Sequence, residues 1–292
     1  DYGRIDKCAA MAFKGRVLLW YASPLFNPTN SQDRWQAAYT ANKNAVDFLR
    51  SEGKDLYPKF GDIWYDERNC EVVMVNQYEY PDRPIAQRAL RPAPFSKNQA
   101  DNDVPVMSLL LSFPKKDGSP MELDRNRLND VEYNKQFTDD FYTNRDDRFY
   151  ASIFCGGTVY PAKTSLAPGV RYWCTWRKTD DTYRNMSLDQ GIAIFTGRTG
   201  FYRTKGLDKS LDAATGGDGS VDWIVIRFAE VLMNYGECAN QVNKTQEALQ
   251  VLYDIRKRAG ITPGAGNRYG VTAQTKEQIQ EAYINENFAE FA

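Results

Sequence analysis

Apolar residues recur at helical spacing at both ends of this 292-residue chain, and that pattern constrains its fold more than any other feature. Residues 6–23 carry one apolar stripe, made of Ala9, Ala12, Phe13, Val17, Trp20 and Tyr21. Residues 31–53 carry a second, made of Trp35, Ala38, Asn42, Ala45 and Leu49. We therefore expect an antiparallel helix pair over residues 1–53, with Trp20 and Trp35 in its core.

Helical periodicity returns in residues 223–241 and 245–259. Gly236 and Ala248 are small enough to let these two helices approach closely, as in a tetratricopeptide repeat. Trp223 falls on the first of these stripes and is expected in the core.

A last helix is expected to open at the sequence Thr-Lys-Glu-Gln from Thr275 to Gln278, which is typical of a capping box. Residues 221–292 therefore predict a helix pair followed by one more helix. Helix pairs of this kind cannot bury their outer faces alone, so we expect further helices beyond one or both termini.

The middle of the chain, residues 54–220, has a different texture. Short β-prone runs at residues 70–75, 104–113, 150–154 and 192–195 are separated by Pro, Gly, Asn and Asp. Loops longer than about 12 to 15 residues usually carry function or are disordered, and the aromatic residues here argue for function. The predicted fold is mainly α, with tetratricopeptide-like helix pairs and a loop-rich segment that contains a few short strands.

Composition excludes several functional classes. The chain has no histidine, so a Ser-His-Asp or Cys-His relay and an HExxH zinc site are impossible. A net charge of -1 gives no general attraction to phosphate backbones, so nucleic acid is not an expected partner. No motif indicates a metal or a cofactor, and none is expected.

Neither the hydropathy nor the cysteines indicate a membrane span or a disulfide framework. No apolar run reaches the roughly 18 residues that a transmembrane helix requires. Any membrane anchor is therefore expected upstream of Asp1. Five cysteines without CxxC spacing are interpreted as buried free thiols: Cys8, Cys70, Cys155, Cys174 and Cys238.

Five segments together resemble the SusD/RagB family of Bacteroidota surface lipoproteins. The first is the Ala-rich stretch of residues 3–17 with the SPLFN sequence of residues 23–27. The others are NRDDRFYASI (144–153), TGFYR (199–203), RFAEVLMNYGE (227–237) and IRKRAG (255–260). The sequence departs from the family at Asp147, usually Pro, and has Asn285-Glu286-Asn287 near a family Glu-Arg pair. The order is kept across nearly the whole chain.

This resemblance implies one SusD-like domain over residues 1–292, incomplete at both ends, that performs no chemistry. It implies a lipoprotein tethered to the outer membrane through an upstream lipid anchor and facing outward. Such a protein would bind an oligosaccharide and deliver it to a SusC-like TonB-dependent transporter. In the RagB branch of the family the ligand would be a peptide.

The expected ligand-binding residues lie in the loop-rich segment. Pyranose rings present apolar C–H faces that pack on flat aromatic rings, while amides, carboxylates and guanidinium groups satisfy the hydroxyls. Aromatic and donor groups of this kind gather at Tyr160, Tyr172, Trp173, Trp176, Arg177 and Tyr183. Strand alternation would place Trp173 opposite Tyr172 and Trp176, so one tryptophan could instead belong to the core.

Other conspicuous residues have structural interpretations. Trp64 and Tyr65 are interpreted as framework, and Arg227 is expected to pair with Glu230 or Glu237 rather than with a ligand.

Asp146, Asp147 and Arg148 could be mistaken for a catalytic carboxylate pair. Acidic residues beside an arginine in a turn usually cap and brace that turn, and we expect the same here. Two competing functions remain, a glycosidase that uses two carboxylates and a scaffold whose helix pairs bind a peptide.

Overall fold

The computed structural model describes residues 2–87, 90, 103–154, 177–179, 182–184, 201–211 and 217–292, with segments 177–179 and 182–184 described by their backbone alone. The chain forms two compact units. Unit 1 comprises Asp1–Asn76, Lys116–Ser119 and Trp223–Ala292, and unit 2 comprises Gln77–Lys115 and Pro120–Asp222. This division leaves the prediction of one domain over residues 1–292 untested.

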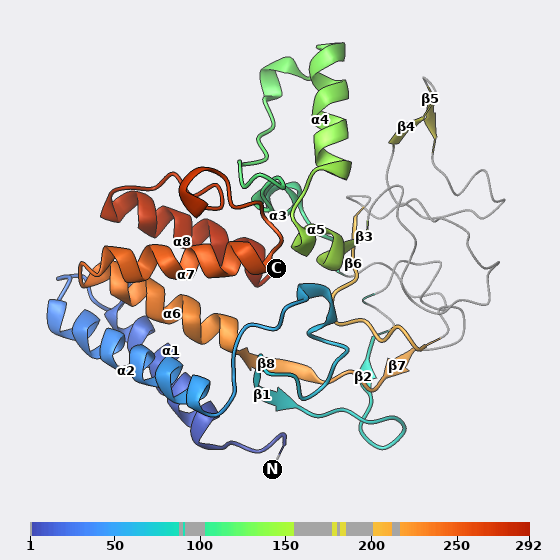
Figure 1. Cartoon of the computed structure of the whole chain (residues 1–292). Helices are drawn as coiled ribbons and strands as arrows, with labels where there is room; N and C mark the ends of the chain where they lie inside the picture. Colours follow the sequence, from blue (N-terminus) through green and yellow to red (C-terminus); the bar gives the residue numbers. More distant parts are fainter. Residues whose placement is uncertain are drawn as a thin grey trace. The chain divides into compact units, whose positions relative to one another are not determined.

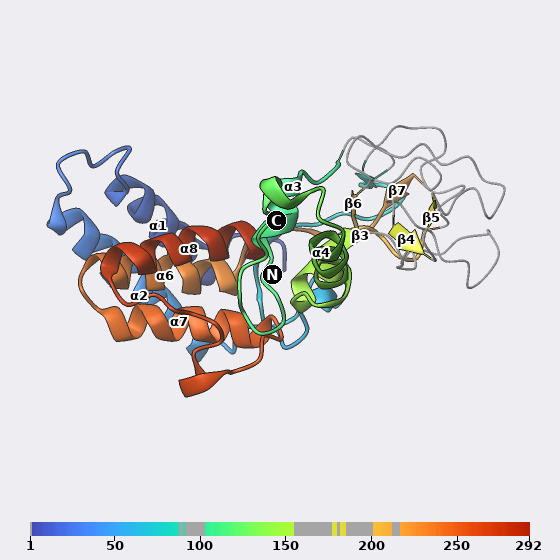
Figure 2. The same ribbon diagram turned by 90° about the horizontal axis from the view of Figure 1, so that it is seen from above.

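Unit 1 is a stack of antiparallel helix pairs (Figure 1). Its helices are α1 (Lys7–Ala22), α2 (Gln32–Ser51), α6 (Phe228–Gln241), α7 (Thr245–Arg258) and α8 (Lys276–Glu290). Helix α1 packs on α2, α2 on α6 and α6 on α7, while α8 lies against both α6 and α7 (Figure 2). Hairpins stacked in this order are typical of tetratricopeptide-like repeats, so the predicted helical fold is confirmed.

Local sequence signals fix where these helices begin. The Asp6 carboxylate accepts a hydrogen bond from the Ala9 amide at 2.9 Å and caps α1. The predicted capping box of α8 is present, because the side chains of Thr275 and Gln278 each accept from the other's backbone N–H.

Gly236 explains why α6, α7 and α8 can pack so closely. A Cβ atom at this position would lie 1.9 Å from the hydroxyl oxygen of Tyr283 and 2.9 Å from Val251. The Tyr283 hydroxyl instead donates a hydrogen bond to the Ala248 carbonyl at 2.6 Å. The sequence prediction that small residues allow close helix approach is therefore correct.

Helix α1 buries Ala9 and Ala12 of its predicted stripe but leaves Phe13, Val17, Trp20 and Tyr21 exposed. Its buried residues are small or thin, namely Cys8, Ala9, Ala12, Gly15, Leu19 and Ala22. Trp20 is 58% exposed, so its prediction as a core residue is wrong, whereas Trp35 of α2 is 3% exposed and its prediction is correct. The reason is that α1 packs at short range on α2: a Cβ atom at Gly15 would lie 2.2 Å from the Asn42 side chain.

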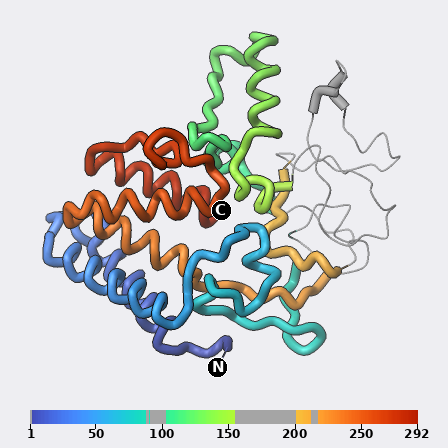
Figure 3. The backbone as a smooth tube through the Cα atoms, in the orientation of Figure 1, coloured from blue at the N-terminus to red at the C-terminus, as the bar shows by residue number. Residues whose placement is uncertain are grey.

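A two-stranded antiparallel ribbon leads into α6. It pairs β1 (Val72–Asn76) with β8 (Trp223–Arg227), and Figure 3 shows these distant segments side by side. Residues 223–227 were expected in a helix, but their β-branched side chains pair with β1 and the helix starts only at Phe228. Trp223 lies at the end of the ribbon and is 51% exposed, so its prediction as a core residue is also wrong.

A short turn, Lys116–Ser119, completes unit 1 beside η5 (Ala265–Asn267). The Thr262 amide donates to the Lys116 carbonyl at 2.9 Å. Gly118 has a φ of +84°, and a Cβ atom there would lie 2.5 Å from the Tyr269 carbonyl oxygen. Only glycine fits this conformation and this distance.

Unit 2 contains shorter elements. Its helices are α3 (Met107–Ser112), η4 (Arg125–Arg127), α4 (Val131–Thr143) and α5 (Asp147–Ser152). Its strands are β2 (Ile85–Ala86), β3 (Ile153–Phe154), β4 (Arg177–Thr179), β5 (Thr182–Arg184), β6 (Tyr202–Arg203) and β7 (Asp218–Gly219). They form three antiparallel pairs, β2 with β7, β3 with β6, and β4 with β5.

The β-prone runs were therefore only partly predicted. The run at residues 70–75 overlaps β1, whereas α3 occupies much of residues 104–113 and α5 the first half of 150–154. A short apolar run does not distinguish a strand from a buried helical turn. The fourth run, residues 192–195, lies outside the described residues.

Among the described residues, no helix is long and apolar enough to cross a membrane.

Cys8, Cys70 and Cys238 are free thiols. Cys8 and Cys238 are buried, and Cys70 is partly buried. Burial raises the pKa of the Cys238 thiol well above its ordinary value, so this group stays protonated. Cys155 and Cys174 lie outside the part of the chain that the structure describes.

Candidate functional site

Most of the predicted ligand-binding residues lie outside the described residues. Tyr160, Tyr172, Trp173 and Trp176 are outside the described residues. The backbone of Arg177 belongs to β4 and that of Tyr183 to β5, in a hairpin whose register pairs Lys178 with Tyr183. These six residues therefore stay a prediction, and the described residues of unit 2 contain a second candidate.

Helix α4 carries a row of three aromatic rings at a spacing of four residues. The Tyr133 and Phe137 ring centroids are 6.1 Å apart with planes inclined by 30°. The Phe137 and Phe141 centroids are 5.6 Å apart and stacked at 29°. Because residues four apart lie on one face of a helix, the three rings form a continuous apolar strip, the α4 aromatic row.

Buried rings anchor one end of this row. Phe141 is 2% exposed and meets Phe149 and Phe201 edge to face, with centroids 5.7 and 5.6 Å away. Tyr142 stacks on Phe201 with planes at 17°. Phe137 and Tyr133 are only partly buried. The row therefore leaves the core of unit 2 and reaches solvent along α4.

Polar groups hold the exposed end of the row. The Arg127 guanidinium lies 4.6 Å from the Tyr133 ring centroid and pairs with Asp130 at 2.7 Å. Hydrogen bonds from the Tyr133 amide and from Arg127 keep the pKa of Asp130 below its ordinary value. The Asp124 amide donates to the Tyr133 hydroxyl at 2.5 Å. Residues that precede α4 thus hold Tyr133 through both its ring and its hydroxyl.

A second polar group lies further along the helix. Asp140 of α4 pairs with Lys115 at 3.0 Å and accepts from Asn144 at 3.4 Å. Partial burial would raise the pKa of Asp140, but hydrogen bonds from Lys115 and Asn144 outweigh that effect and lower it. An ionised carboxylate therefore stands on the same helix as the aromatic row, and the ammonium group of Lys115 and the amide of the C-cap Asn144 lie beside it.

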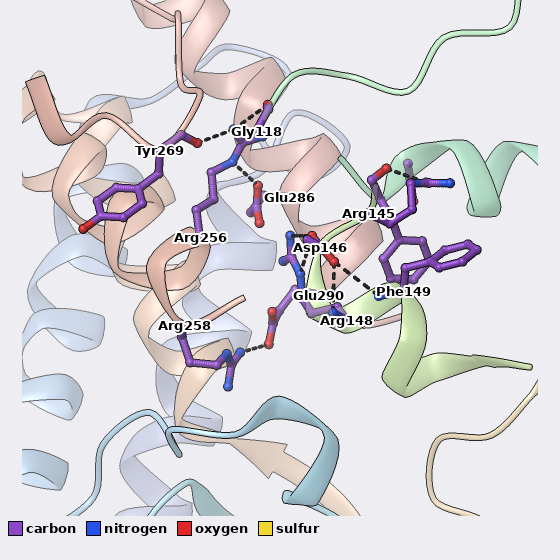
Figure 4. Close-up of polar contacts among 12 residues, drawn as sticks. Gly118, Arg145, Asp146, Arg148, Phe149, Arg256, Arg258, Tyr269, Glu286 and Glu290 are labelled. Carbon is purple, nitrogen blue, oxygen red and sulfur yellow. Dashed lines mark hydrogen bonds and ion pairs between the residues drawn. The ribbon is translucent and has the colours of Figure 1, made fainter. Parts of the chain in front are cut away.

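The segment after α4 has a structural role. Asp146 caps α5 by accepting from the Arg148 and Phe149 amides at 3.0 and 3.2 Å, and it pairs with the Arg148 guanidinium at 2.7 Å (Figure 4). Both side chains of this ion pair are fully buried. The interpretation that they brace a turn is confirmed, and Asp146 is not placed for acid–base chemistry in solvent.

Arg145 supports the base of the row from within. Its guanidinium donates to the carbonyls of Phe113, at 2.5 Å, and Leu110. It also lies 4.4 Å from the Phe149 ring centroid and 5.1 Å from that of Phe141. The position of Phe141 is therefore fixed by a buried cation as well as by neighbouring rings.

Unit 1 has a buried charge network, of which the sequence predicted only that Arg227 pairs with a carboxylate. Arg227 was expected to pair with Glu230 or Glu237, but it pairs with Glu71 at 2.7 Å and Glu290 at 2.9 Å. Arg258 joins the same two carboxylates, at 2.7 Å for Glu71. Figure 4 shows its pair with Glu290. The expected partners are engaged elsewhere in unit 1, Glu230 by Arg16 and Glu237 by Gln280.

Aromatic rings enclose this network, which we call the Arg–Glu network of Glu71, Arg227, Arg258 and Glu290. The Arg227 guanidinium lies 5.4 Å from the Trp64 ring centroid, and Phe60 of η1 (Phe60–Asp62) lies between 5 and 6 Å from both arginines. Burial alone would lower the pKa of Arg227. Its two carboxylate partners have the larger effect and raise the pKa above its ordinary value, so Arg227 keeps its charge. Trp64 is framework, as expected.

The arrangement of α4 suits a ligand with apolar faces and hydroxyl groups. Aromatic rings pack on the apolar faces, and the flanking carboxylate, ammonium and amide groups hydrogen-bond hydroxyls. Within the described ranges, no group of cysteine and acidic side chains could hold a metal ion. This row was not predicted from the sequence, although Tyr133, Phe137 and Phe141 at four-residue spacing after the N-cap Asp130 were a readable signal.

Comparison with known proteins agrees with this architecture. A sequence model described as the SusD family matches residues 66–292. The chain belongs to the SusD family. No curated protein matches this chain.

Solved structures of family members share the fold. A SusD-like protein from Bacteroides fragilis is 21% identical with a TM-score of 0.70, over 99% of this chain and 52% of that one. A SusD-like carbohydrate binding protein from Bacteroides fragilis is 23% identical with a TM-score of 0.69, over 99% and 50%. A SusD homolog from Bacteroides thetaiotaomicron is 15% identical with a TM-score of 0.63, over 100% and 51%. This chain spans about half the length of these relatives.

Proposed function

We propose that this SusD family member is a non-catalytic carbohydrate-binding protein that holds an oligosaccharide at the cell surface. The observation that carries the proposal is the α4 aromatic row, which runs from the buried Phe141 to the partly exposed Phe137 and Tyr133. The Bacteroides fragilis relative described as a carbohydrate binding protein supports the same ligand class.

The chemistry of the row supports binding rather than bond cleavage. A pyranose ring stacked on Phe137 would place its hydroxyls near the polar groups of α4. Asp140 is hydrogen-bonded by Lys115, and Asp130 by Arg127, so each carboxylate has a lowered pKa. A glycosidase needs one carboxyl group that stays protonated near neutral pH, and a lowered pKa opposes that role.

The residues predicted from the sequence belong to the same proposal. Tyr160, Tyr172, Trp173, Trp176, Arg177 and Tyr183 are proposed to contribute further ligand contacts. The protein is further proposed to be an outer-membrane lipoprotein that delivers its ligand to a SusC-like TonB-dependent transporter. A neighbouring reading frame that encodes a large β-barrel with a plug domain would support that partner.

Calorimetry of the purified protein against a panel of oligosaccharides tests the proposal. We expect one glycan to bind, and Phe137→Ala to weaken it by about 0.5 to 1.5 kcal/mol, which is roughly a 2- to 13-fold rise in Kd. Trp173→Ala and Trp176→Ala are expected to weaken binding in the same direction. Trp223→Ala is the matched control, because Trp223 is 51% exposed but lies in unit 1.

Other outcomes would redirect the proposal. If no glycan bound and peptides did, the protein would be a peptide receptor of the RagB kind. Release of reducing sugar that a single Asp or Glu substitution abolishes would make it a glycosidase. Unchanged glycan affinity in Phe137→Ala would remove the α4 aromatic row from the site.

A further inference from the structure

Two tyrosine rings form a tilted pair at the edge of the core of unit 1. Tyr253 belongs to α7, and Tyr269 belongs to the segment that joins α7 to α8. Their ring centroids are 6.5 Å apart, with the ring planes inclined by 40°. Both residues are only partly buried, whereas Tyr283 of the same unit is fully buried. The pair, which we call the Tyr253–Tyr269 pair, therefore stays partly accessible from outside.

The backbone of Tyr269 is held in an unusual conformation. Its φ is +51°, in the left-handed region that favours glycine. Its amide donates to the Pro263 carbonyl at 2.9 Å, and its carbonyl accepts from the Arg256 guanidinium at 3.0 Å. Arg256 also pairs with Glu286 at 2.7 Å, and Figure 4 shows the Tyr269 ring directed away from that guanidinium. Residues held in such conformations by their surroundings cluster at ligand clamps and active sites.

The hydroxyl groups of the pair are not used in packing. Tyr39 and Tyr235 of unit 1 both donate their hydroxyl protons to Glu247, at 2.7 and 2.6 Å. Within the ranges that the structure describes, the hydroxyls of Tyr253 and Tyr269 make no such bond. Buried tyrosine hydroxyls usually find a partner, so these two hydroxyls are placed to bond to water or to a ligand.

Polar side chains of α7 flank the Tyr253 ring. Gln250 lies three residues before Tyr253 and Lys257 four residues after it, so both share its face of the helix, and both are exposed. The Gln250 amide donates to the Asp254 carboxylate at 2.9 Å. An amide, an ammonium group and a carboxylate therefore lie on α7 beside the two rings. Aromatic rings with polar groups of this kind suit the apolar faces and the hydroxyls of a sugar.

We propose that the Tyr253–Tyr269 pair is a second saccharide-binding site, distinct from the α4 aromatic row. The pair belongs to unit 1 and the row to unit 2, and the proposal rests on the proposed function for its class of ligand. A polymeric glycan repeats the same sugar many times, so two sites on one protein can hold one glycan chain at two places. Such double attachment raises the overall affinity without requiring either site to bind tightly.

NMR spectra of protein with isotope-labelled tyrosine rings test this proposal. The probes are hexasaccharides of glucose, xylose, mannose and galactose at millimolar concentration. One probe should shift the ring signals of Tyr253 and Tyr269 until they saturate. Tyr133 reports on the α4 aromatic row in the same spectra. Tyr235 is the control, because its hydroxyl is bonded to Glu247, and its signal should not shift.

Two glycine variants of one segment separate the ring from the backbone. Tyr269→Gly removes a ring, and glycine adopts the positive φ without strain. The probe concentration that half-saturates the Tyr253 signal should then rise about 2- to 13-fold. Asn267→Gly is the matched control, because Asn267 has a φ of +54° and no aromatic ring. That variant should leave the half-saturation concentration unchanged, as should Phe137→Ala in the α4 aromatic row.

The spectra distinguish failure of this proposal from failure of the proposed function. A shift at Tyr133 without a shift at Tyr253 and Tyr269 would overturn the second site and leave the α4 aromatic row in place. Equal effects of Tyr269→Gly and Asn267→Gly would also overturn it, because the ring would then not matter. Loss of the Tyr253 shift in Phe137→Ala would merge the pair with the α4 site. No shift at any tyrosine with any probe would count against both proposals.

Discussion

Tyr283 of unit 1 and the α4 aromatic row of unit 2 place their rings in different surroundings. In unit 1, Tyr283 is fully buried between three helices, and its hydroxyl donates to a backbone carbonyl. In unit 2, the rings of α4 run from the buried Phe141 to the partly exposed Phe137 and Tyr133. The first arrangement fills space, and the second leaves ring surface available to a ligand.

Whether an aromatic residue serves packing or binding depends on how far its ring is enclosed. A ring enclosed on all sides contributes to stability, because its removal leaves a cavity. A ring that is anchored at one edge and open at the other contributes little to stability but offers a fixed surface. Substitutions should therefore affect folding in unit 1 and binding at the exposed end of α4.

The largest effect is expected in the Arg–Glu network. Glu71→Gln removes a charge that pairs with both Arg227 and Arg258 and accepts from the Tyr57 amide at 2.8 Å. Leaving buried arginines undercompensated should lower the free energy of unfolding by about 3 to 5 kcal/mol, measured by urea denaturation.

The matched control for this prediction is an exposed ion pair of the same unit. Asp47→Asn breaks the pair of Lys43 and Asp47, whose side chains are 44% and 60% exposed. The cost there should be below about 1 kcal/mol. Equal losses in Glu71→Gln and Asp47→Asn would contradict the view that the network is buried and structural.

Phe141→Ala and Phe137→Ala compare two positions one helical turn apart in α4. Phe141 is 2% exposed, so its removal should cost about 3 to 5 kcal/mol of unfolding free energy, by cavity formation. Phe137→Ala should cost clearly less stability, while weakening glycan binding. Thermal denaturation and calorimetry on both variants separate the two effects, and a reversed order would contradict the anchored-row geometry.

Gly236→Ala tests the close packing of unit 1 with a single methyl group. The added carbon would clash with the Tyr283 hydroxyl, so stability should fall by about 1 to 3 kcal/mol. Tyr283→Phe in the Gly236→Ala background removes the clashing oxygen and should recover part of that loss. A double-mutant cycle measures the coupling, and strictly additive losses would mean that the two groups do not meet.

The smallest expected effect is a pH dependence at Tyr39. Burial and a hydrogen bond to Glu247 raise the pKa of Tyr39 from 10.0 to about 12. An unfolded tyrosine ionises near pH 10, so the stabilisation is complete below that pH and is lost between pH 10 and about 12. Unfolding free energies across this range should fall less steeply in Tyr39→Phe, and identical slopes would contradict the assignment.

Local sequence signals determined most of unit 1. The apolar stripe of α2, the capping box at Thr275 and the small residue Gly236 each act over a few residues or one helix contact. The bracing role of Asp146 was predictable for the same reason, since a capping side chain bonds to amides two and three residues away.

The remaining features depend on contacts between segments that are far apart in the sequence. Arg227 pairs with Glu71 and Glu290, which are far from it in sequence. A prediction based on carboxylates close to Arg227 in the sequence therefore named the wrong partners. The face of α1 that is buried could not be predicted because both of its faces are apolar, and close contact with α2 selects the small residues. Periodicity locates an element, whereas which side of it is buried depends on what packs against it.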